Sequence, residues 1–266
     1  MADPATASSA SMSSASSHRR SEIAWRTGAN TSELVVASFI GTSARVGSSR
    51  PEKFRPLSHC DTECRAELLS GIPAANQRGR PMEPTDQLAV IIPMLTNLVD
   101  QLDADQLTAP TACANFDVSG VLDHMMGGAA AFVPAFRGET AGSPASTVTA
   151  GRVPKDDYRR AMNGLLDAAS SPGAMERTID APFGQVPGSV FASFVAFDGL
   201  VHGWDIATAA GLPYDPPADV VAAVDEFARA TLGPEMRDGD TFAIATEAPA
   251  AAGRLEKLVA FSGRTL

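Results

Sequence analysis

The sequence of 266 residues predicts an all-α protein: a helical bundle with a small C-terminal extension, preceded by a disordered N-terminal tail. Three observations predict this class. Apolar residues recur at helical spacing in several segments after Met82. One of these segments, residues 189–211, is apolar on nearly every side, and only residues 241–246 (TFAIAT) have the character of a strand. A helix that is apolar all round must be surrounded by other helices, so a bundle is the expected architecture.

The first two helices are predicted from their apolar periodicity. The first has Thr85 as its expected N-cap, although Pro93 should kink this helix or delay its start. The second begins near Asp117 and continues to about Phe136. His124 falls on the flank of its apolar face, where a side chain could be half exposed.

Three more helices and a short final one are expected after a linker rich in Gly, Ser and Thr. Their predicted ranges are about 155–169, 189–211 and 218–231. Gly211 is suited to end the longest of them, and Pro213 just beyond it acts as a stop signal. The segment AGRLEKLVAFSG then predicts a short helix near the end of the chain.

Residues 1–81 and residues 82–266 are predicted to be two different parts of the chain. The first part opens with the low-complexity stretch ATASSASMSSASS and has no sustained period of 2 or 3.6, so we expect it to be disordered. Either it is a genuine tail or translation begins at Met82. The tail carries ten Lys or Arg and seven Asp or Glu, whereas the body carries eleven and twenty-four, for net charges of +3 and −13.

The negative charge of residues 82–266 argues against two classes of binding partner. A body so acidic repels phosphate backbones and anionic lipid surfaces, so we expect neither nucleic acid nor a membrane as a partner. No run of apolar residues approaches the length of a membrane-spanning helix, and no secretion signal is recognisable. The expected location is the cytoplasm.

The three cysteines favour no disulfide framework. Cys60 and Cys64 (CDTEC) lie in the tail, have three residues between them and are followed by no second pair, so we do not expect them to bind metal or act as a redox pair. Cys113 is interpreted as a reduced intracellular thiol. It precedes the second helix and could lie near a functional site, although a buried and inert thiol is the simpler interpretation.

The body has only two histidines, and both are placed where they could bind a metal ion. His202 follows Asp198 by four residues, so the two side chains share one face of the same helix. With His124 from the second helix they form a predicted site of two imidazoles and one carboxylate, which leaves positions open for water or substrate. The alternative for Asp198 is a buried ion pair with Arg159 or Arg160, and His202 taken alone could be a core histidine.

Neighbouring residues add to this interpretation. Gly199 and Gly203 each cost about 1 kcal/mol relative to alanine inside a helix, so the close approach of another helix is expected beside the ligands, unless the glycines are simply tolerated. Asp205 either orients a ligand or has a surface or helix-pairing role, and Trp204 is expected to pack. Nucleotide-binding glycine loops, a serine-hydrolase elbow and the paired Glu-x-x-His motifs of di-iron bundles are absent from the sequence.

Three segments resemble one known family: TACANFDVSGVLDHM, FDGLVHGWDIATAAGLP and the closing LEKLVAFSGR. They resemble the actinobacterial mycothiol-dependent maleylpyruvate isomerase-like family, which belongs to the DinB-like metal-binding four-helix bundles. The resemblance covers about residues 82–266. It implies a divalent metal, usually zinc, bound by His124, Asp198 and His202, with aspartate where relatives often have glutamate. The isomerase of this family uses a further C-terminal domain for its substrate, which this chain is too short to hold in full, so that particular reaction is not inherited.

The leading expectation is a cytoplasmic, metal-dependent transferase or isomerase that uses a small thiol, mycothiol, against a small electrophile. Metal coordination would deprotonate the thiol, which would then add to the electrophile. A metal-binding or ligand-binding bundle without turnover is the alternative, and a non-haem iron oxygenase can share the same ligand set. The expected partners are the thiol and the electrophile, and the bundle is expected to be capable of forming a homodimer.

Overall fold

The structure is a computed structural model that describes residues 81–114, 116–139, 152–181, 184–237 and 242–266. The predicted disordered tail lies outside these residues, apart from Pro81, and so do Cys60 and Cys64. The predictions for that part of the chain are therefore not tested.

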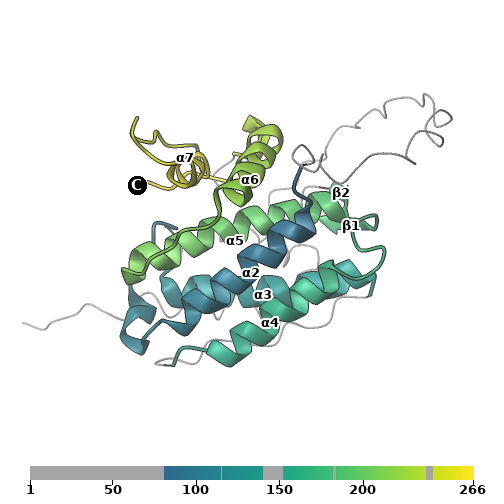
Figure 1. The fold of residues 1–266 in the computed structure, drawn as a ribbon, viewed down its shortest axis with the longest axis horizontal. Helices are drawn as coiled ribbons and strands as arrows, with labels where there is room; N and C mark the ends of the chain where they lie inside the picture. Colours follow the sequence, from purple (N-terminus) through teal and green to yellow (C-terminus); the bar gives the residue numbers. More distant parts are fainter. Residues whose placement is uncertain (1–80, 115, 140–151, 182–183, 238–241) are drawn as a thin grey trace, which may run out of the picture.

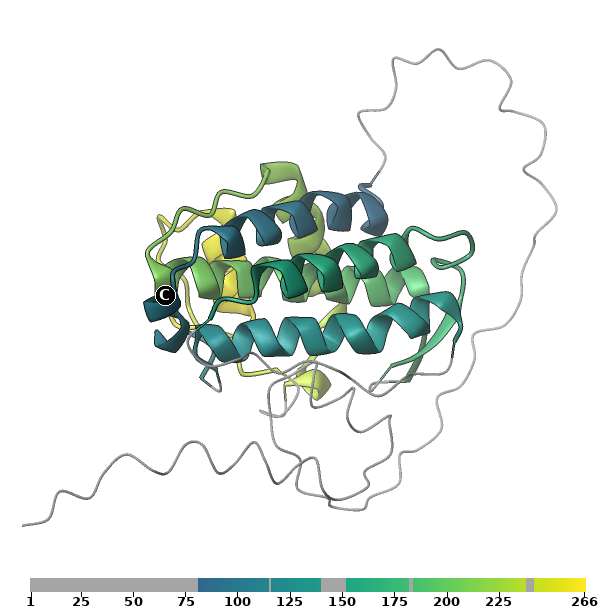
Figure 2. The same ribbon diagram turned by 90° about the horizontal axis from the view of Figure 1, so that it is seen from below.

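Four long helices lie side by side and form the predicted bundle (Figure 1). They are α2 (Pro84–Asp100), α3 (Val118–Arg137), α4 (Lys155–Ala169) and α5 (Gly188–Ala210). Helix α2 packs against both α4 and α5, and α3 packs against α4, while the contact that joins α3 to α5 is less extensive. Figure 2 shows the bundle from a second direction, with the helices still side by side. The candidate ligands meet where α3 faces α5.

Two further helices lie on one side of the bundle. Helices α6 (Ala218–Thr231) and α7 (Arg254–Phe261) cover the side of α5 that faces away from α3 and α4 (Figure 1). Phe194 of α5 meets Phe227 of α6 edge to face, with ring centroids 5.0 Å apart. This layer is the predicted C-terminal extension, and it makes α5 the central helix of the molecule.

The start of α2 differs from the prediction. Pro84 occupies the first helical position and Glu83 is the N-cap, so Thr85 lies inside the helix. A proline at this position costs no hydrogen bond, because an N–H group there would have no partner within the helix. Pro93 neither delays nor ends the helix. It lies on the exposed face of α2, as does Ala89, whose carbonyl would otherwise accept from residue 93 and can bind water instead.

Helices α3 and α4 agree closely with the prediction. Asp117 caps α3, with its side chain accepting a hydrogen bond from the Gly120 amide at 2.8 Å. Gly138 ends this helix with a φ of 70°, in the left-handed region. His124 was expected on a flank that could be half exposed, but only 8% of the residue is accessible. The reason is that α5 covers this flank of α3.

Helix α5 was predicted as the central helix, and its burial confirms this. Sixteen of its 23 residues are buried. The expectation that no apolar run approaches the length of a membrane-spanning helix was wrong, because α5 is long enough and apolar enough to cross a membrane. However, 83% of its most apolar window is buried within the protein, which identifies α5 as a core helix.

The strand prediction was also wrong. Residues 242–246 form no strand, and the strands in the described part of the chain are β1 (Thr178–Ala181) and β2 (Gly184–Pro187), paired antiparallel just before α5. In this hairpin Ile179 pairs with Val186. Gly184 has a φ of 117°, a backbone conformation that residues with a Cβ atom rarely adopt. The two strands are too short to show a clear period of two in the sequence.

The two glycines of α5 allow its neighbours to come close, as expected. A Cβ atom on Gly199 would lie 3.2 Å from Ile91 and 3.3 Å from Leu95, both on α2. A Cβ atom on Gly203 would overlap the Tyr214 hydroxyl and would lie 2.9 Å from Leu95. These contacts place α2 and the chain after α5 directly behind the face that carries the candidate ligands.

We predict that Gly203→Ala lowers the free energy of unfolding by about 1–3 kcal/mol, because the added methyl group overlaps Tyr214 and Leu95. Gly164→Ala in α4 is the matched control. Nothing lies within 4 Å of its Cβ position, so this change should stabilise the protein by about 0.5–1 kcal/mol. Chemical denaturation measures both. Equal effects of the two substitutions would contradict the close packing at Gly203.

Candidate metal centre

The three predicted ligands converge in the gap between α3 and α5. His124 comes from α3, whereas Asp198 and His202 lie one turn apart on α5. One ligand atom from each residue lies within 4.8 Å of the other two. The side chains of His124 and His202 are 4% and 5% exposed, and that of Asp198 is 23% exposed. The carboxylate is thus the accessible member of a largely buried trio.

The distances from Asp198 to the two rings suit ligands around one ion. The Nε2 atoms of His124 and His202 each lie 3.4 Å from Asp198 Oδ1. This is long for a charge-assisted hydrogen bond, which is usually about 2.7–2.9 Å. Atoms bonded to a tetrahedral zinc ion at about 2.0–2.2 Å are separated from each other by roughly 3.3–3.6 Å. The donor set of two imidazoles and a carboxylate therefore suits a divalent ion in both chemistry and spacing.

The alternative interpretation of Asp198 is wrong. Arg159 forms its ion pairs with Asp100, at 2.6 Å, and with Asp156, at 2.9 Å. Arg160 pairs with Asp157 on its own helix. Neither guanidinium reaches α5, so the two imidazoles are the groups that face the Asp198 carboxylate.

Electrostatics couple the carboxylate to the rings. Burial alone would raise the pKa of Asp198, but the facing rings of His202 and His124 hold it well below its usual range. Burial alone would lower the pKa of His202, but Asp198 and the hydrogen bonds of the ring raise it to about 9. Without a metal ion, Asp198 is therefore a carboxylate at neutral pH and His202 is an imidazolium, with a proton on each ring nitrogen. A divalent ion must displace the proton on Nε2 in order to bind there.

A second set of residues orients the His202 ring from behind. Its Nδ1 atom lies 3.0 Å from Asp205 Oδ2, and the Arg264 guanidinium donates to the same oxygen at 3.1 Å. Asp205 is fully buried. A carboxylate that accepts from Nδ1 fixes the tautomer that presents a bare Nε2 to a metal ion. Of the two roles considered for Asp205, the structure supports the orienting one.

Arg264 was not predicted as part of the site. It lies 59 residues after Asp205, close to the C-terminus, and no local pattern connects the two. Burial alone would lower the pKa of Arg264, but Asp205 outweighs this effect and raises it. The C-terminal segment thus reaches the candidate centre through a buried ion pair. Trp204, which was expected to pack, is half-buried on α5.

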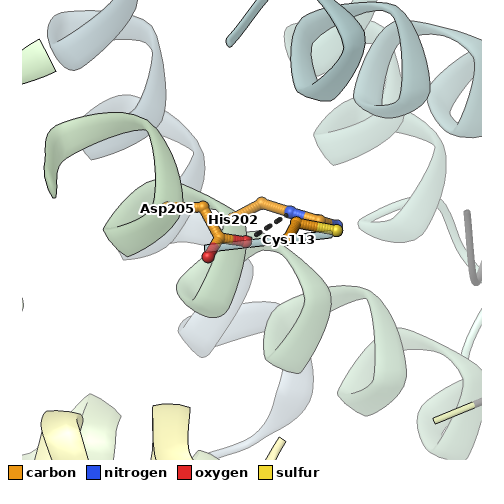
Figure 3. A group of neighbouring side chains, drawn as sticks. All are labelled: Cys113, His202 and Asp205. Atoms are coloured by element: carbon orange, nitrogen blue, oxygen red, sulfur yellow. Dashed lines mark hydrogen bonds and ion pairs between the residues drawn. The ribbon is translucent and has the colours of Figure 1, made fainter. Parts of the chain in front are cut away.

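Cys113 lies beside this arrangement. Its sulfur, a His202 ring nitrogen and an Asp205 carboxylate oxygen are all within 4.8 Å of one another. Figure 3 shows the sulfur next to the His202 ring while Asp205 faces Nδ1. The cysteine is half-buried. The expectation that Cys113 could lie near the site is confirmed. The simpler interpretation as a buried and inert thiol is wrong about the burial, and the inertness stays a prediction.

A small cavity adjoins the trio on the side of α4. It has a volume of about 20 Å³ and is lined at one end by His124 and Asp198. The rest of its lining is apolar and includes Met125, Phe132 and Met162. A cavity of this size holds about one water molecule. The polar end of the cavity therefore gives one small ligand access to the candidate metal position.

Comparison with known proteins identifies the family. The model of the mycothiol maleylpyruvate isomerase N-terminal domain matches residues 88–207, a range that contains all three candidate ligands. The chain is 31% identical over 170 residues to the uncharacterized protein Rv0738 of Mycobacterium tuberculosis strain H37Rv, which covers 64% of this chain and 91% of the relative. The uncharacterized protein MT0763 of strain CDC 1551 matches with the same values. The chain belongs to the mycothiol maleylpyruvate isomerase N-terminal domain family. No solved structure matches it significantly.

We predict that Asp205→Asn weakens metal binding by about 10- to 100-fold, because Nδ1 loses the charged partner that orients the ring. Asp225→Asn is the matched control: Asp225 likewise has two basic partners, Arg229 and Arg254, but it lies on α6 and pairs with none of the candidate ligands. Competition with a chromogenic chelator measures both affinities. Unchanged affinity in Asp205→Asn would show that the Asp205 contact does not orient a ligand.

We also predict that metal binding tightens as the pH rises. The pKa of His202 is about 9 in the metal-free protein, so at pH 7 each bound ion releases about one proton from this ring. The apparent affinity should increase up to tenfold per pH unit below pH 9. Calorimetry in buffers of different ionisation enthalpy counts the released protons. Binding without proton release at pH 7 would contradict coordination by His202.

Proposed function

We propose that the chain is a metal-dependent enzyme that uses a small thiol, mycothiol, to attack a small electrophile, as a transferase or isomerase. The observation that carries this proposal is that the Asp198 carboxylate lies 3.4 Å from a ring nitrogen of both His124 and His202. Membership of a family described by mycothiol and maleylpyruvate isomerase supports the choice of thiol. Two imidazoles and one carboxylate support zinc as the ion.

When bound, the ion would lower the pKa of a coordinated thiol, so that the thiol is a thiolate at neutral pH. Several side chains of the protein would position and shield the ligands of this ion. Asp205, which also pairs with Arg264, holds Nδ1–H of His202, so that Nε2 is the nitrogen left for the ion once the ion has displaced its proton. Asp198 supplies one negative charge. Phe116 covers the His124 ring, with centroids 5.5 Å apart, and keeps water from that side. Asp198 remains accessible, which leaves a side from which substrates can enter.

The cavity next to Asp198 indicates the character of the electrophile. Its lining is apolar beyond His124 and Asp198, and two of its walls are the side chains of Met125 and Met162. Methionine side chains adapt to the shape of a ligand. A small electrophile with an apolar portion fits this lining better than a multiply charged one.

The charge of the body bears on the classes of partner that we propose. The net charge of −13 for residues 82–266 supports neither a nucleic acid nor an anionic membrane as a partner. A cytoplasmic location and a homodimer complete the proposal. The family match itself supports a protein that acts on small molecules.

A metal-binding or ligand-binding bundle without turnover is the second candidate. The size of the cavity favours it, because about 20 Å³ holds roughly one water molecule and is too small for a thiol together with an electrophile. The enzyme proposal therefore requires the methionine side chains to move when substrates bind.

We predict that the purified protein binds one zinc ion and that His202→Ala removes stoichiometric metal, because this residue supplies one of three ligands and pairs with Asp198. Arg160→Ala is the control, since Arg160 is exposed and pairs only with Asp157 among the described residues. Elemental analysis measures the metal. Unchanged metal content in His202→Ala would mean that the candidate centre is not the binding site.

The zinc-loaded protein should also consume mycothiol in the presence of chlorodinitrobenzene, faster than the metal-free protein and the His202→Ala variant. The assay is run with and without oxygen. Equal anaerobic activity excludes an iron oxygenase, whereas bound zinc with no rate above background favours the binding bundle.

A further inference from the structure

We propose that Cys113 is a fourth, exchangeable ligand of the ion bound by His124, Asp198 and His202, and that the thiol substrate replaces it. This inference rests on the proposed metal centre and adds a residue that the comparison with the family does not assign. It is carried by the cluster of Cys113, His202 and Asp205, whose ligand atoms lie within 4.8 Å of one another (Figure 3). His202 belongs to both clusters. The sulfur as placed does not lie within 4.8 Å of the ligand atoms of all three trio residues, so a rotation about χ1 of Cys113 must bring it to the metal position.

The loop before α3 holds Cys113 at this place. The Thr111 hydroxyl accepts a hydrogen bond from the Cys113 amide at 3.2 Å and donates to the Phe116 carbonyl at 2.6 Å. The Phe116 amide donates to the Cys113 carbonyl at 3.0 Å, and Pro110 pairs with Asp117 in an isolated bridge. These hydrogen bonds hold the backbone at Cys113 and Phe116 in place. Only the single χ1 torsion of the cysteine separates the observed position of the sulfur from others around the ring.

The second cluster does not suit an ion of its own. Asp205 Oδ2 already faces Nδ1 of His202 and accepts from Arg264 at 3.1 Å. A cation between Cys113 and Asp205 would also be repelled by the Arg264 guanidinium, which is close enough to Cys113 for the two charges to interact. Among the described residues, the sulfur of Cys113 would therefore coordinate the ion that Nε2 of His202 binds.

Charge balance favours this fourth ligand. Two neutral imidazoles and the Asp198 carboxylate leave a divalent ion with a net charge of +1 in a centre whose rings are 4% and 5% exposed. A buried net charge is costly. A thiolate from Cys113 brings the centre to neutrality and supplies a soft donor, which zinc accepts readily.

This arrangement gives Cys113 a role in the proposed thiol chemistry. On coordination, the Cys113 sulfur loses its proton to the solvent. The incoming thiol then exchanges with it: the sulfur of the substrate takes the coordination position, and the proton of the substrate passes to Cys113, which leaves as a neutral thiol. No oxidant or reductant is needed, and the charge of the centre is unchanged.

The test uses the full chain with cobalt(II) in place of zinc. Cys60→Ser/Cys64→Ser is the background, so that Cys113 is the only cysteine in the protein. A thiolate bound to cobalt(II) gives an intense charge-transfer band in the near ultraviolet. We expect this band in the background protein, its loss on adding Cys113→Ser, and one bound cobalt per chain in both.

X-ray absorption of the zinc form of the background protein gives a second measurement without a change at residue 113. One zinc–sulfur distance of about 2.3 Å is expected. Bound metal with no sulfur in its shell, or a band that persists after Cys113→Ser, would overturn the inference and leave the proposed function intact. Absence of bound metal in the background protein would overturn both. Circular dichroism of the Cys113→Ser variant establishes that a lost band does not come from unfolding.

Discussion

The candidate centre depends on one carboxylate placed between two imidazoles in the gap between α3 and α5. Asp198 lies 3.4 Å from a ring nitrogen of each histidine, and these groups are the partners that hold its pKa low. A carboxylate in the middle of an apolar core helix is costly unless it is paired or bound to a cation. The two histidines reduce this cost, but their nitrogens stay 3.4 Å from the carboxylate. A divalent ion would fit between these ligand atoms.

The rest of the fold supports this arrangement. Gly199 and Gly203 allow α2 and Tyr214 to pack directly behind the ligand face of α5. Asp205 and Arg264 hold the His202 ring from the side of the C-terminal segment. The layer formed by α6 and α7 therefore contributes to the centre indirectly, because it brings the chain back to α5 at Arg264.

The features that the sequence predicted well depend on local spacing. The bounds of α4 and α6, the Asp117 cap of α3 and the Gly211 end of α5 follow from periodicity and capping preferences. The Thr85 cap was wrong because Pro84 takes the first helical position after Glu83. Pro93 did not delay the start, because it lies on the exposed face of α2, and the kink stays a prediction. The hairpin before α5 was missed because strands of four residues carry too little pattern.

Three features could be predicted without any structure: the helical class, the shared face of Asp198 and His202, and the small set of imidazoles from which a site could be built. These follow from the geometry of a single helix, which depends on residues a few positions apart. The packing of the helices, in contrast, had to be seen to learn that His124 is buried against α5 and that Arg159 and Arg160 pair elsewhere. The same holds for Cys113, which lies beside His202, and for Arg264, which pairs with Asp205. Such contacts join residues tens of positions apart, so they depend on how the helices pack and not on any local pattern.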